Sequence, residues 1–573
     1  MARPAVSTSA LAAARGDVPA DLLLRGGRVF SPFTREWVTV DLAIADGCVV
    51  GWGSRDAHEV LDVDGAALTP GFIDAHMHIE SSKLWIDEFV RGVLPTGTTA
   101  VACDPHEIAN VLGMRGVLAL IRAAAAMPFT FGVAASSCVP ASHLESSGAA
   151  FSAADVASLI DEHGAIGVAE VMNVPGVISG NEAIRKIIAA AGWRSVDGHA
   201  PGLAGRALDA YLAAGVESDH EVTTLDEATE KRRKSMWLFL RQGSASQDVL
   251  ELLPSVIRGG SLGAAFCTDD REPDAVRDLG HLNYCLRLAT ENGLSEIDAL
   301  LMATCNPAAF HRFFHLGALG PGFQADVCVF DRLEGWKPSM VLQKGRVVAR
   351  AGVIEPGVVP DSAPPDWMFN SIHLARNPSV ADLTIAEPSS GKARVIGAAP
   401  RTLLTTSRIV DVRDLGVDLA RIAVLERHKA TGRIGLGYVS GMGIARGAIA
   451  STVAHDAHNV MVVGAREERG PHDMAVAVAR LAEIGGGQIV VFDGRVVAEI
   501  ALPIAGLMSD RGLAEVADQL DAVHAAAHAL GSTLPAPFMT LSFLGLSVIP
   551  ELRITDLGLI DVVAFKPVPV AVP

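Results

Sequence analysis

The stretch PGFIDAHMHIE, residues 70–80, gives the first indication of the fold of this chain. An apolar run ends in His76 and His78, which stand two positions apart, so both side chains point to the same face of an extended chain. Two histidines on one face can bind the same metal ion. The stretch therefore predicts a strand that ends in part of a metal site, although His-X-His alone also suits a surface or hydrogen-bonded pair.

Beyond this stretch, apolar runs alternate with Ala- and Leu-rich helical stretches, which is typical of βα units and a parallel sheet. We expect eight strands, of which the third and seventh are short enough to suit a helix equally well. Their region, residues 70–315, has the length of about 250 residues that is typical of a TIM-type (β/α)8 barrel. The expected strands span residues 71–76, 98–103, 129–136, 165–171, 194–199, 216–220, 236–240 and 262–268.

Further metal-binding residue types stand at the carboxyl ends of these strands. Glu170 ends the fourth strand, His199 the fifth and His220 the sixth, and Asp269 follows the eighth. Barrel enzymes build their active sites at this rim. With the two histidines of the first strand, these side chains suit two divalent ions if Glu170 bridges them. Ions held about 3.5–4 Å apart would share a hydroxide, because they lower the pKa of bound water towards about 7.

Short β-rich runs flank the barrel region on both sides, and Gly-Gly and Asp-Gly turn signals separate the runs that precede it. A Pro-rich stretch at 355–367 favours a linker or an extended wrap. We expect a flexible amino-terminal lead, a small split β-sandwich domain with the linker, the metallohydrolase barrel inserted in it, and a carboxyl-terminal α/β domain. These parts span residues 1–20, 21–69 with 316–380, 70–315 and 381–573, respectively.

Composition excludes several classes of partner. The chain has 573 residues, 50% hydrophobic, and a formal net charge of −18. Such an acidic balance disfavours nucleic acid and anionic membranes, which need clustered Lys and Arg. No run reaches the roughly 20 apolar residues of a membrane helix, and no signal peptide is evident. Seven scattered cysteines without a CxxC pair favour a reducing cytoplasm.

Longer motifs accompany the candidate ligands. They include GTTAVACDPHEIANVLG (97–113), CTDD (267–270), ERHKATGRIGLG (426–437) and VAHDAHN (453–459). With these motifs the chain resembles the adenine deaminase family of the amidohydrolase superfamily over about residues 21–573. His-X-His marks only the superfamily, whereas CDPHEIANVLG and ERHKATGRIGLG are specific to adenine deaminases.

This resemblance implies hydrolytic deamination of adenine to hypoxanthine and ammonia, as in purine salvage, by a homodimer with a binuclear manganese or iron centre. Zinc also suits mixed imidazole and carboxylate ligands. Glu170 would bridge the ions in place of the carboxylated lysine of many amidohydrolases. The resemblance assigns His76, His78 and Asp269 to the first ion, and His199 and His220 to the second.

The expected chemistry is attack of the bridging hydroxide on C6 of the purine. We expect Asp269 to pass the proton of the hydroxide to the departing amine, because a carboxylate at the metal reaches both groups. Glu170 could relay a proton as well. Glu221, next to a ligand, could protonate the ring or hold a salt bridge.

Other residues at the rim have less defined roles. In CDPHE, His106 and Glu107 would contact the substrate or support the ligands; the alternative for this motif is that Asp104 caps the loop. Glu80 and Ser81 would position the first loop or contact the substrate.

Two further features lie outside the ligand pattern. Asp270 is expected to cap a helix. In the HDAH run, His455, Asp456 and His458 have no other ligand types nearby in the sequence. We therefore expect this run to close the pocket or to form a domain contact, and not to bind a metal.

Three alternatives remain at this point. An N-acetylglucosamine-6-phosphate deacetylase resembles the same histidine pattern, but typically lacks so large a carboxyl-terminal domain. Adenosine could replace adenine if the pocket had room for a ribose. A metal-free scaffold could retain the barrel without catalysis, although such relatives normally lose ligands.

Overall fold

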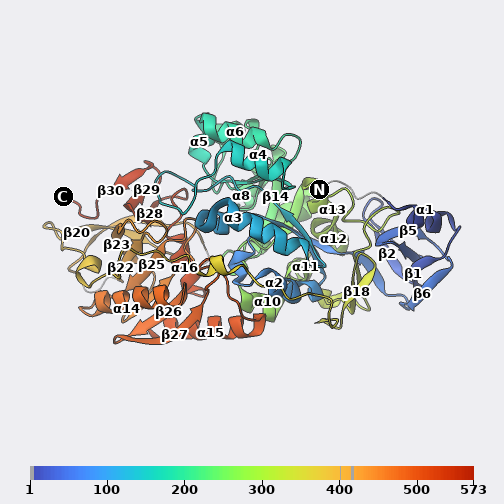
Figure 1. The fold of residues 1–573 in the computed structure, drawn as a ribbon. Coiled ribbons are helices and arrows are strands. Elements are labelled where there is room, and N and C mark those ends of the chain that lie inside the picture. The colour runs from blue at the N-terminus through green and yellow to red at the C-terminus, as the bar shows by residue number, and fades with distance from the viewer. Residues whose placement is uncertain (1–5, 401, 415–417) are drawn as a thin grey trace.

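All eight strands expected between residues 70 and 315 are present in the computed structural model, which describes residues 6–400, 402–414 and 418–573. They lie in the centre of the molecule, between the carboxyl-terminal domain and a β-rich part that contains the amino-terminal strands (Figure 1). The strands are β8 (Phe72–Met77), β9 (Thr98–Cys103), β10 (Thr130–Val133), β11 (Gly167–Val171), β12 (Ser195–Gly198), β13 (Ser218–Asp219), β14 (Trp237–Arg241) and β15 (Ala264–Cys267).

Parallel pairing joins these strands into a ring. Continuous ladders connect β8 to β9 and β10, β11 to β12, and β13 to β14 and β15. Parallel bridges from Ala135 to Val168 and from Met77 to Asp269 connect β10 to β11 and β15 to β8. A backbone hydrogen bond from Glu217 links β13 to β12. The carboxyl ends of all eight strands therefore meet at one rim.

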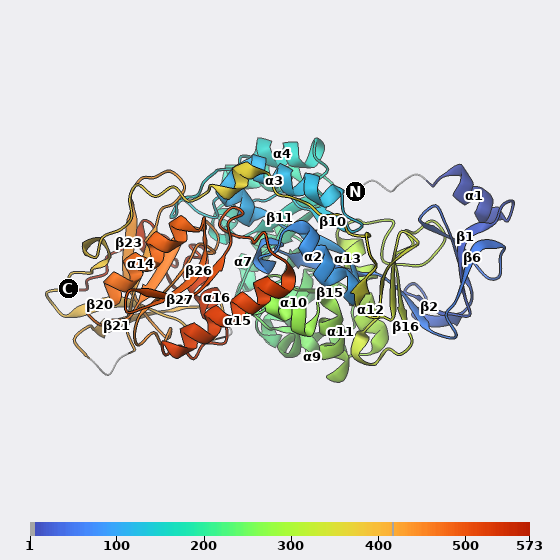
Figure 2. The ribbon, with the colours of Figure 1, turned by 60° about the horizontal axis from the view of Figure 1, so that its bottom comes forward.

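Helices follow the strands and cover the ring from outside (Figure 2). In α8 the local sequence explains the helix: Thr224 caps the first turn, which is acidic, and the last turn is basic, as the helix dipole favours. These helices are α2 (Ile86–Val93), α3 (His106–Ala125), α4 (Ala153–Asp161), α5 (Val174–Ile178), α6 (Glu182–Ala190), α7 (Gly205–Ala213), α8 (Leu225–Arg233), α9 (Val249–Gly259), α10 (Pro273–Leu279), α11 (Leu282–Glu291), α12 (Glu296–Ala303) and α13 (Cys305–Phe310).

Helix α3 is the one helix among the described residues that is long and apolar enough to cross a membrane by length and composition. More than half of its most apolar window, 56%, is buried inside the protein. Its first residues, His106 and Glu107, belong to the rim, and Gly113 interrupts it with φ of 63°. The helix packs in the core, so its apolar character has a structural explanation.

Strands from both flanks of the barrel form two sheets. One has the order β5-β4-β1-β6, and the other has the order β19-β18-β17-β16-β7-β2-β3. In the second sheet β16 pairs antiparallel with β7, which joins the two chain segments. Leu24 and Ile44 of the first sheet share a buried core with Leu68, Val327 and Leu342 of the second. The strands are β1 (Ala20–Arg25), β2 (Arg28–Ser31), β3 (Glu36–Thr39), β4 (Leu42–Ala45), β5 (Cys48–Trp52), β6 (Ala57–Asp62), β7 (Ala67–Pro70), β16 (Val327–Phe330), β17 (Met340–Gln343), β18 (Arg346–Arg350) and β19 (Val353–Ile354).

The expectation of a flexible lead over residues 1–20 is wrong for its described part. Residues Thr8–Arg15 form helix α1, which is capped by Ser7 and ends at Gly16 with φ of 83°. Ala10 and Ala13 are buried against the first β-sheet. Their small side chains allow close packing of the helix, which an Ala-rich sequence without a long apolar run does not reveal.

The Pro-rich stretch is an extended wrap. The hydroxyl of Ser362 lies 3.2 Å from the indole nitrogen of Trp85, and its backbone N–H donates to Asp87 of α2. Further along, the guanidinium of Arg115 in α3 stacks on Trp367. The wrap therefore crosses the barrel helices before the chain enters the carboxyl-terminal domain.

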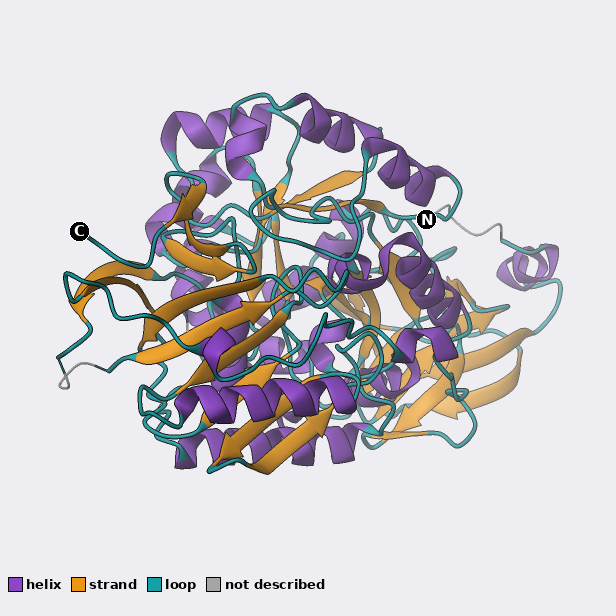
Figure 3. Ribbon diagram, turned by 60° about the vertical axis from the view of Figure 1, so that its left-hand side comes forward, coloured by secondary structure: helices purple, strands orange, loops and turns teal. Residues whose placement is uncertain are grey.

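The carboxyl-terminal domain contains an eight-stranded sheet with the order β21-β20-β23-β22-β25-β24-β26-β27. Figure 3 shows long strands with helices beside them on the side of the molecule where the carboxyl terminus lies. The apolar face of α14, including Met474 and Leu481, packs on this sheet. The elements are β20 (Lys392–Gly397), β21 (Thr406–Asp411), β22 (Ala420–Leu425), β23 (Ile434–Ser440), β24 (Ala448–Ser451), β25 (Val460–Gly464), α14 (Gly470–Glu483), β26 (Gly487–Phe492), β27 (Arg495–Ala501), α15 (Leu513–Ala529), α16 (Pro537–Phe543), β28 (Leu552–Thr555), β29 (Gly558–Asp561) and β30 (Lys566–Val568).

This domain lies directly against the barrel. Helix α15 runs beside α10, where Arg277 forms ion pairs of 2.8 Å with both Asp518 and Asp521 (Figure 2). A backbone bridge joins Leu84, at the barrel rim, to Ser509. Residues 454–459, between β24 and β25, form the HDAH loop, which reaches the rim of the barrel at the start of α3.

Candidate metal centre

The six candidate ligands predicted from the strand ends lie together at the barrel rim, and all are buried. The first two belong to β8 and its following loop, and the others stand at or just after the ends of β11, β12, β13 and β15. They are His76, His78, Glu170, His199, His220 and Asp269.

Four of these side chains converge on one position. The Nε2 atoms of His76 and His78 are 3.3 Å apart. From His78 Nε2, Glu170 Oε1 lies at 3.3 Å and Asp269 Oδ1 at 3.2 Å. The same two oxygens lie 3.8 and 3.6 Å from His76 Nε2. Ligand atoms about 2.1 Å from a shared ion are separated by roughly 3.0–3.4 Å, so this spacing suits a divalent metal.

Neighbouring acceptors orient both histidines for this role. His78 Nδ1 donates to the backbone carbonyl of Asp104 at 3.0 Å, so the proton of its neutral ring is on Nδ1. His76 Nδ1 lies 2.7 Å from Asp197 Oδ2. Both Nε2 lone pairs therefore face the shared position, as in metal sites where an outer acceptor fixes the tautomer.

A second set of ligands faces the other oxygen of Glu170. Its Oε2 lies 2.6 Å from His199 Nδ1 and 3.4 Å from His220 Nε2. The opposite ring atoms, His199 Nε2 and His220 Nδ1, make no hydrogen bond within the described part of the chain. Because the two oxygens of Glu170 face different histidine pairs, the carboxylate has the geometry of a bridge between two cations.

The electrostatics of the metal-free protein show how strongly these groups interact. Burial would raise the pKa of Glu170, but His199 and His220 hold it well below its usual range. Burial would lower the pKa of His220, but its hydrogen bond with Glu170 and the charge of that carboxylate raise it to about 10. Buried positive charge is favoured beside these carboxylates, and divalent ions would supply it after the imidazoles lose their protons.

Arg241 belongs to the site, although the sequence pattern did not indicate it. The side chain ends β14 at the same rim and is buried. Its Nη1 lies 3.0 Å from Asp269 Oδ2 and in contact with Glu221 Oε1, while Nη2 lies 2.9 Å from Asp248. Burial would raise the pKa of Asp269, but its hydrogen bond to His78 and the charge of Arg241 hold it well below its usual range. In the sequence, the one feature that could have indicated Arg241 is its position at the end of an apolar strand.

Glu221 stands between the second histidine pair and this arginine. Its Oε1 lies 3.9 Å from His199 Nδ1 and 3.8 Å from His220 Nε2. Its Oε2 is buried and makes no hydrogen bond with any described residue. Burial raises the pKa of Glu221, and the charge of Arg241 opposes this shift. A carboxyl group with one free oxygen beside the ligands can hold or release a proton.

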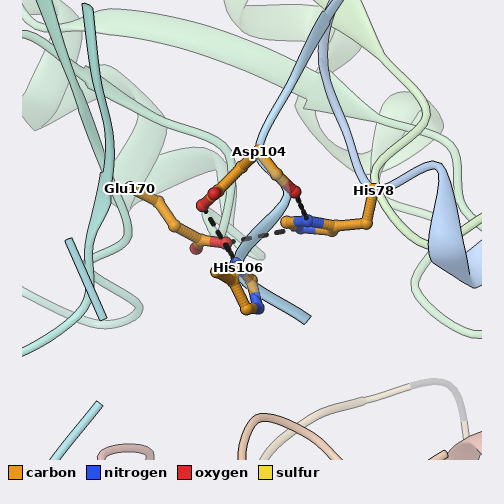
Figure 4. A group of neighbouring side chains, drawn as sticks. All are labelled: His78, Asp104, His106 and Glu170. Atoms are coloured by element: carbon orange, nitrogen blue, oxygen red, sulfur yellow. Dashed lines mark hydrogen bonds and ion pairs between the residues drawn. The ribbon is translucent and has the colours of Figure 1, made fainter. Parts of the chain in front are cut away.

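His106 lies beside Glu170 (Figure 4). Its Nδ1 is 2.9 Å from Asp104 Oδ2 and 3.4 Å from Glu170 Oε1. Asp104 also accepts a hydrogen bond of 2.8 Å from Ser136. The expectation that Asp104 caps the loop is therefore wrong, because both carboxylate oxygens bind side chains of the site.

An acidic group lies next to the ligands. Ser81 Oγ is 2.8 Å from Glu107 Oε1 and 2.5 Å from Asp270 Oδ1. Glu80 accepts a hydrogen bond from the backbone of Ile108, and burial together with the charge of Glu107 raises its pKa to about 8. The helix-cap role expected for Asp270 is wrong, because α10 begins at residue 273 and has residue 272 as its N-cap.

The HDAH loop adds side chains from the carboxyl-terminal domain. Asp456 Oδ1 lies 3.4 Å from His106 Nε2, and His458 Nε2 lies 3.7 Å from Glu107 Oε2. His455 lies near Glu107 as well, at 3.8 Å. The expected domain contact is thus present. Its partners are separated from it by more than 300 residues in the chain, so local sequence could not identify them.

Comparisons with known proteins cover both halves of the chain. The sequence model described as the Amidohydrolase family matches residues 67–359, and the one described as the Adenine deaminase C-terminal domain matches residues 400–566. The chain is 43% identical over 570 residues to adenine deaminase 2 of Carboxydothermus hydrogenoformans, covering 97% of this chain and 98% of that protein. It is also 43% identical to an adenine deaminase of Methanothrix thermoacetophila, with 98% of each chain covered.

Among solved structures, a β-aspartyl dipeptidase from Fervidobacterium islandicum aligns with a TM-score of 0.44 and 17% identity. The alignment covers 58% of this chain and 98% of the dipeptidase.

Proposed function

The chain belongs to the adenine deaminase family, and from this premise we propose that it hydrolyses adenine to hypoxanthine and ammonia. One observation of the site carries the proposal: the two oxygens of Glu170 face two separate histidine pairs, as a bridging ligand of two cations requires. Overall, water adds at C6, the bond from C6 to the exocyclic nitrogen breaks, and ammonia leaves.

The residues at the rim fit a pair of divalent ions. The first would be held by His76, His78 and Asp269, the second by His199 and His220, with Glu170 shared. Mn or Fe is our proposal for the metal, and Zn suits the same ligand types. When bound, the ions would supply a hydroxide nucleophile at neutral pH.

The remaining groups would transfer protons. We propose that Asp269 transfers a proton from the nucleophile to the leaving amine, because Oδ1 faces the ligands while Oδ2 is anchored by Arg241. Glu221, with its free oxygen and raised pKa, is proposed to protonate a ring nitrogen. Glu170 is proposed as an additional relay.

The proposal includes a division of the chain into domains. We propose a catalytic TIM-type barrel over residues 70–315, a split β-sandwich over 21–69 and 316–380, and a carboxyl-terminal α/β domain over 381–573. A cytoplasmic homodimer that binds neither nucleic acid nor membranes completes the proposal. Sedimentation analysis of the purified protein would test the dimer.

A deamination assay tests the function. The metal-free protein is reconstituted with Mn²⁺ or Fe²⁺, and ammonia release and bound metal are measured on the same sample. We expect ammonia from adenine and two ions per chain. Acetate release from N-acetylglucosamine 6-phosphate, faster turnover of adenosine, or no activity in a sample with two bound ions would contradict the proposal.

A further inference from the structure

The HDAH loop covers the acidic side of the metal centre from the other domain. His455 Nε2 lies 3.7 Å from Asp270 Oδ1, and His455 Nδ1 lies 3.8 Å from Glu107 Oε1. Asp456 Oδ1 lies 3.4 Å from His106 Nε2. Four of these side chains are more than nine-tenths buried, and the side chain of Asp270 is 12% exposed. The wall of the site is therefore shared between the barrel and the carboxyl-terminal domain.

The backbone of this loop is firmly held within its own domain. The N–H of His455 donates to Ser542 Oγ at 3.0 Å, and His428 Nε2 donates to the carbonyl of Ala457 at 2.7 Å. The buried guanidinium of Arg427 donates to the carbonyl of His458. These contacts fix the positions of the loop side chains, as a preorganised binding surface requires.

The tips of the side chains, by contrast, lack partners. His455 Nε2, Asp456 Oδ2 and Glu107 Oε2 are buried and make no hydrogen bond with the residues that the structure describes. Buried polar atoms are normally hydrogen-bonded, because burying them without a partner loses the free energy of their hydrogen bonds to water. Such a cluster beside a reaction centre indicates a ligand with several polar atoms.

Hydrogen bonding argues against a cation at His458. His458 Nδ1 accepts a hydrogen bond of 3.0 Å from the N–H of Ala454, so its neutral ring carries the proton on Nε2 and has no lone pair there for a metal.

We propose that the HDAH loop is the far wall of the purine site and that His455 hydrogen-bonds a nitrogen of the five-membered ring. The inference rests on the proposed function. His106 contacts the bridging Glu170 at one ring nitrogen and Asp456 at the other, so one imidazole separates the reaction centre from the loop. In neutral adenine the five-membered ring has one donor and one acceptor. His455 and the adjacent carboxylate of Asp270 offer the complementary pair.

Binding of the product tests this assignment without requiring turnover. Calorimetry with the manganese-loaded full-length protein would compare hypoxanthine affinity in wild type, His455→Ala and His472→Ala, the last being a partly exposed histidine of the same domain. We expect hypoxanthine to bind at least about tenfold more weakly to His455→Ala, with unchanged metal content, and normally to the control. Equal affinity in wild type and His455→Ala would overturn the proposal.

Analogues identify the contact. 7-Deazaadenine and 9-deazaadenine each replace one nitrogen of the five-membered ring by carbon. If His455 contacts that nitrogen, His455→Ala weakens binding of adenine but not of the corresponding analogue. Equal losses for all three bases would overturn the proposal, as would the loss of an ion in His455→Ala, which would assign a cation to the cluster.

A conservative variant separates binding from folding. His455→Gln keeps a hydrogen-bond donor, so it should retain part of the affinity for hypoxanthine, and it replaces His455→Ala in the test if the Ala variant is unstable. A fully folded Gln variant with wild-type affinity for every base would contradict a specific contact of the imidazole. Failure of wild type to release ammonia from adenine, together with His455-dependent binding of hypoxanthine, would reject the proposed function and leave this inference standing.

Discussion

Two clusters of histidines and carboxylates meet in this protein, and they differ in how their side chains are anchored. At the barrel rim, His76 Nδ1 contacts Asp197 and His78 Nδ1 donates to a backbone carbonyl. In both rings Nε2 therefore remains for an ion. In the HDAH loop, His458 Nδ1 already accepts a hydrogen bond from the backbone, so the proton of its neutral ring is on Nε2 and no lone pair remains there for an ion. Residue type alone does not define a metal site; the hydrogen bond on the remote nitrogen does.

Removing a rim ligand should have the largest effect and would show that the rim is needed to hold the ions. We expect His199→Ala or Asp269→Ala to lower turnover of adenine by at least about 1,000-fold, because each removes a ligand from the centre that supplies the nucleophile. Ammonia release and metal content would be measured after manganese loading, with His472→Ala as the control. Retained activity in a metal-replete Asp269→Ala sample would contradict its assignment.

Replacing Arg241 should rank second. Arg241→Met leaves Asp269, Glu221 and Asp248 buried beside one another without their cation, which should cost about 3–5 kcal/mol of stability. We expect a lower midpoint of chemical denaturation and weaker activity, and a partial recovery in Arg241→Lys. Unchanged stability of the Met variant would mean that the carboxylates are neutral or solvated.

The pH dependence of metal binding would further distinguish the rim histidines from those of the HDAH loop. Without metal, the pKa of His220 is raised to about 10, mainly by Glu170 acting against burial, so an ion must displace a proton. Below that pKa, each displaced proton weakens binding by about tenfold per unit of falling pH. We expect affinity to fall by at least about 100-fold from pH 8 to pH 6, measured by competition with a chelator. His455→Ala should keep the same slope; a smaller slope would place its imidazole among the ligands.

Asp456→Asn should have the smallest effect. The substitution keeps the shape of the side chain and an oxygen beside His106, so we expect kcat/KM for adenine to fall only about three- to tenfold and the metal content to stay constant. Steady-state kinetics and metal analysis of one preparation would measure both. A loss of bound metal in this variant would remove the distinction between the two clusters.

The sequence predicted much of the barrel and of its rim. The eight apolar runs are strands, and the ligands at their ends converge because parallel strands share one rim. It did not indicate Arg241, since an arginine after an apolar run is usually a solvent-facing residue. It also treated residues 8–15 as unstructured, because alanines that pack by their small size leave no apolar pattern.

The periodic part of the protein follows from the sequence alone: the βα repeats, the candidate ligand types at strand ends and the family to which its motifs belong. The contact of the HDAH loop with the candidate metal centre, and the side-chain partners of Asp104 and Asp270, are visible only in the folded protein. The cause is the range of the interactions. Strand ends are aligned by local pairing, whereas the contact between two domains depends on the packing of surfaces that are distant in the chain and follow no period in it.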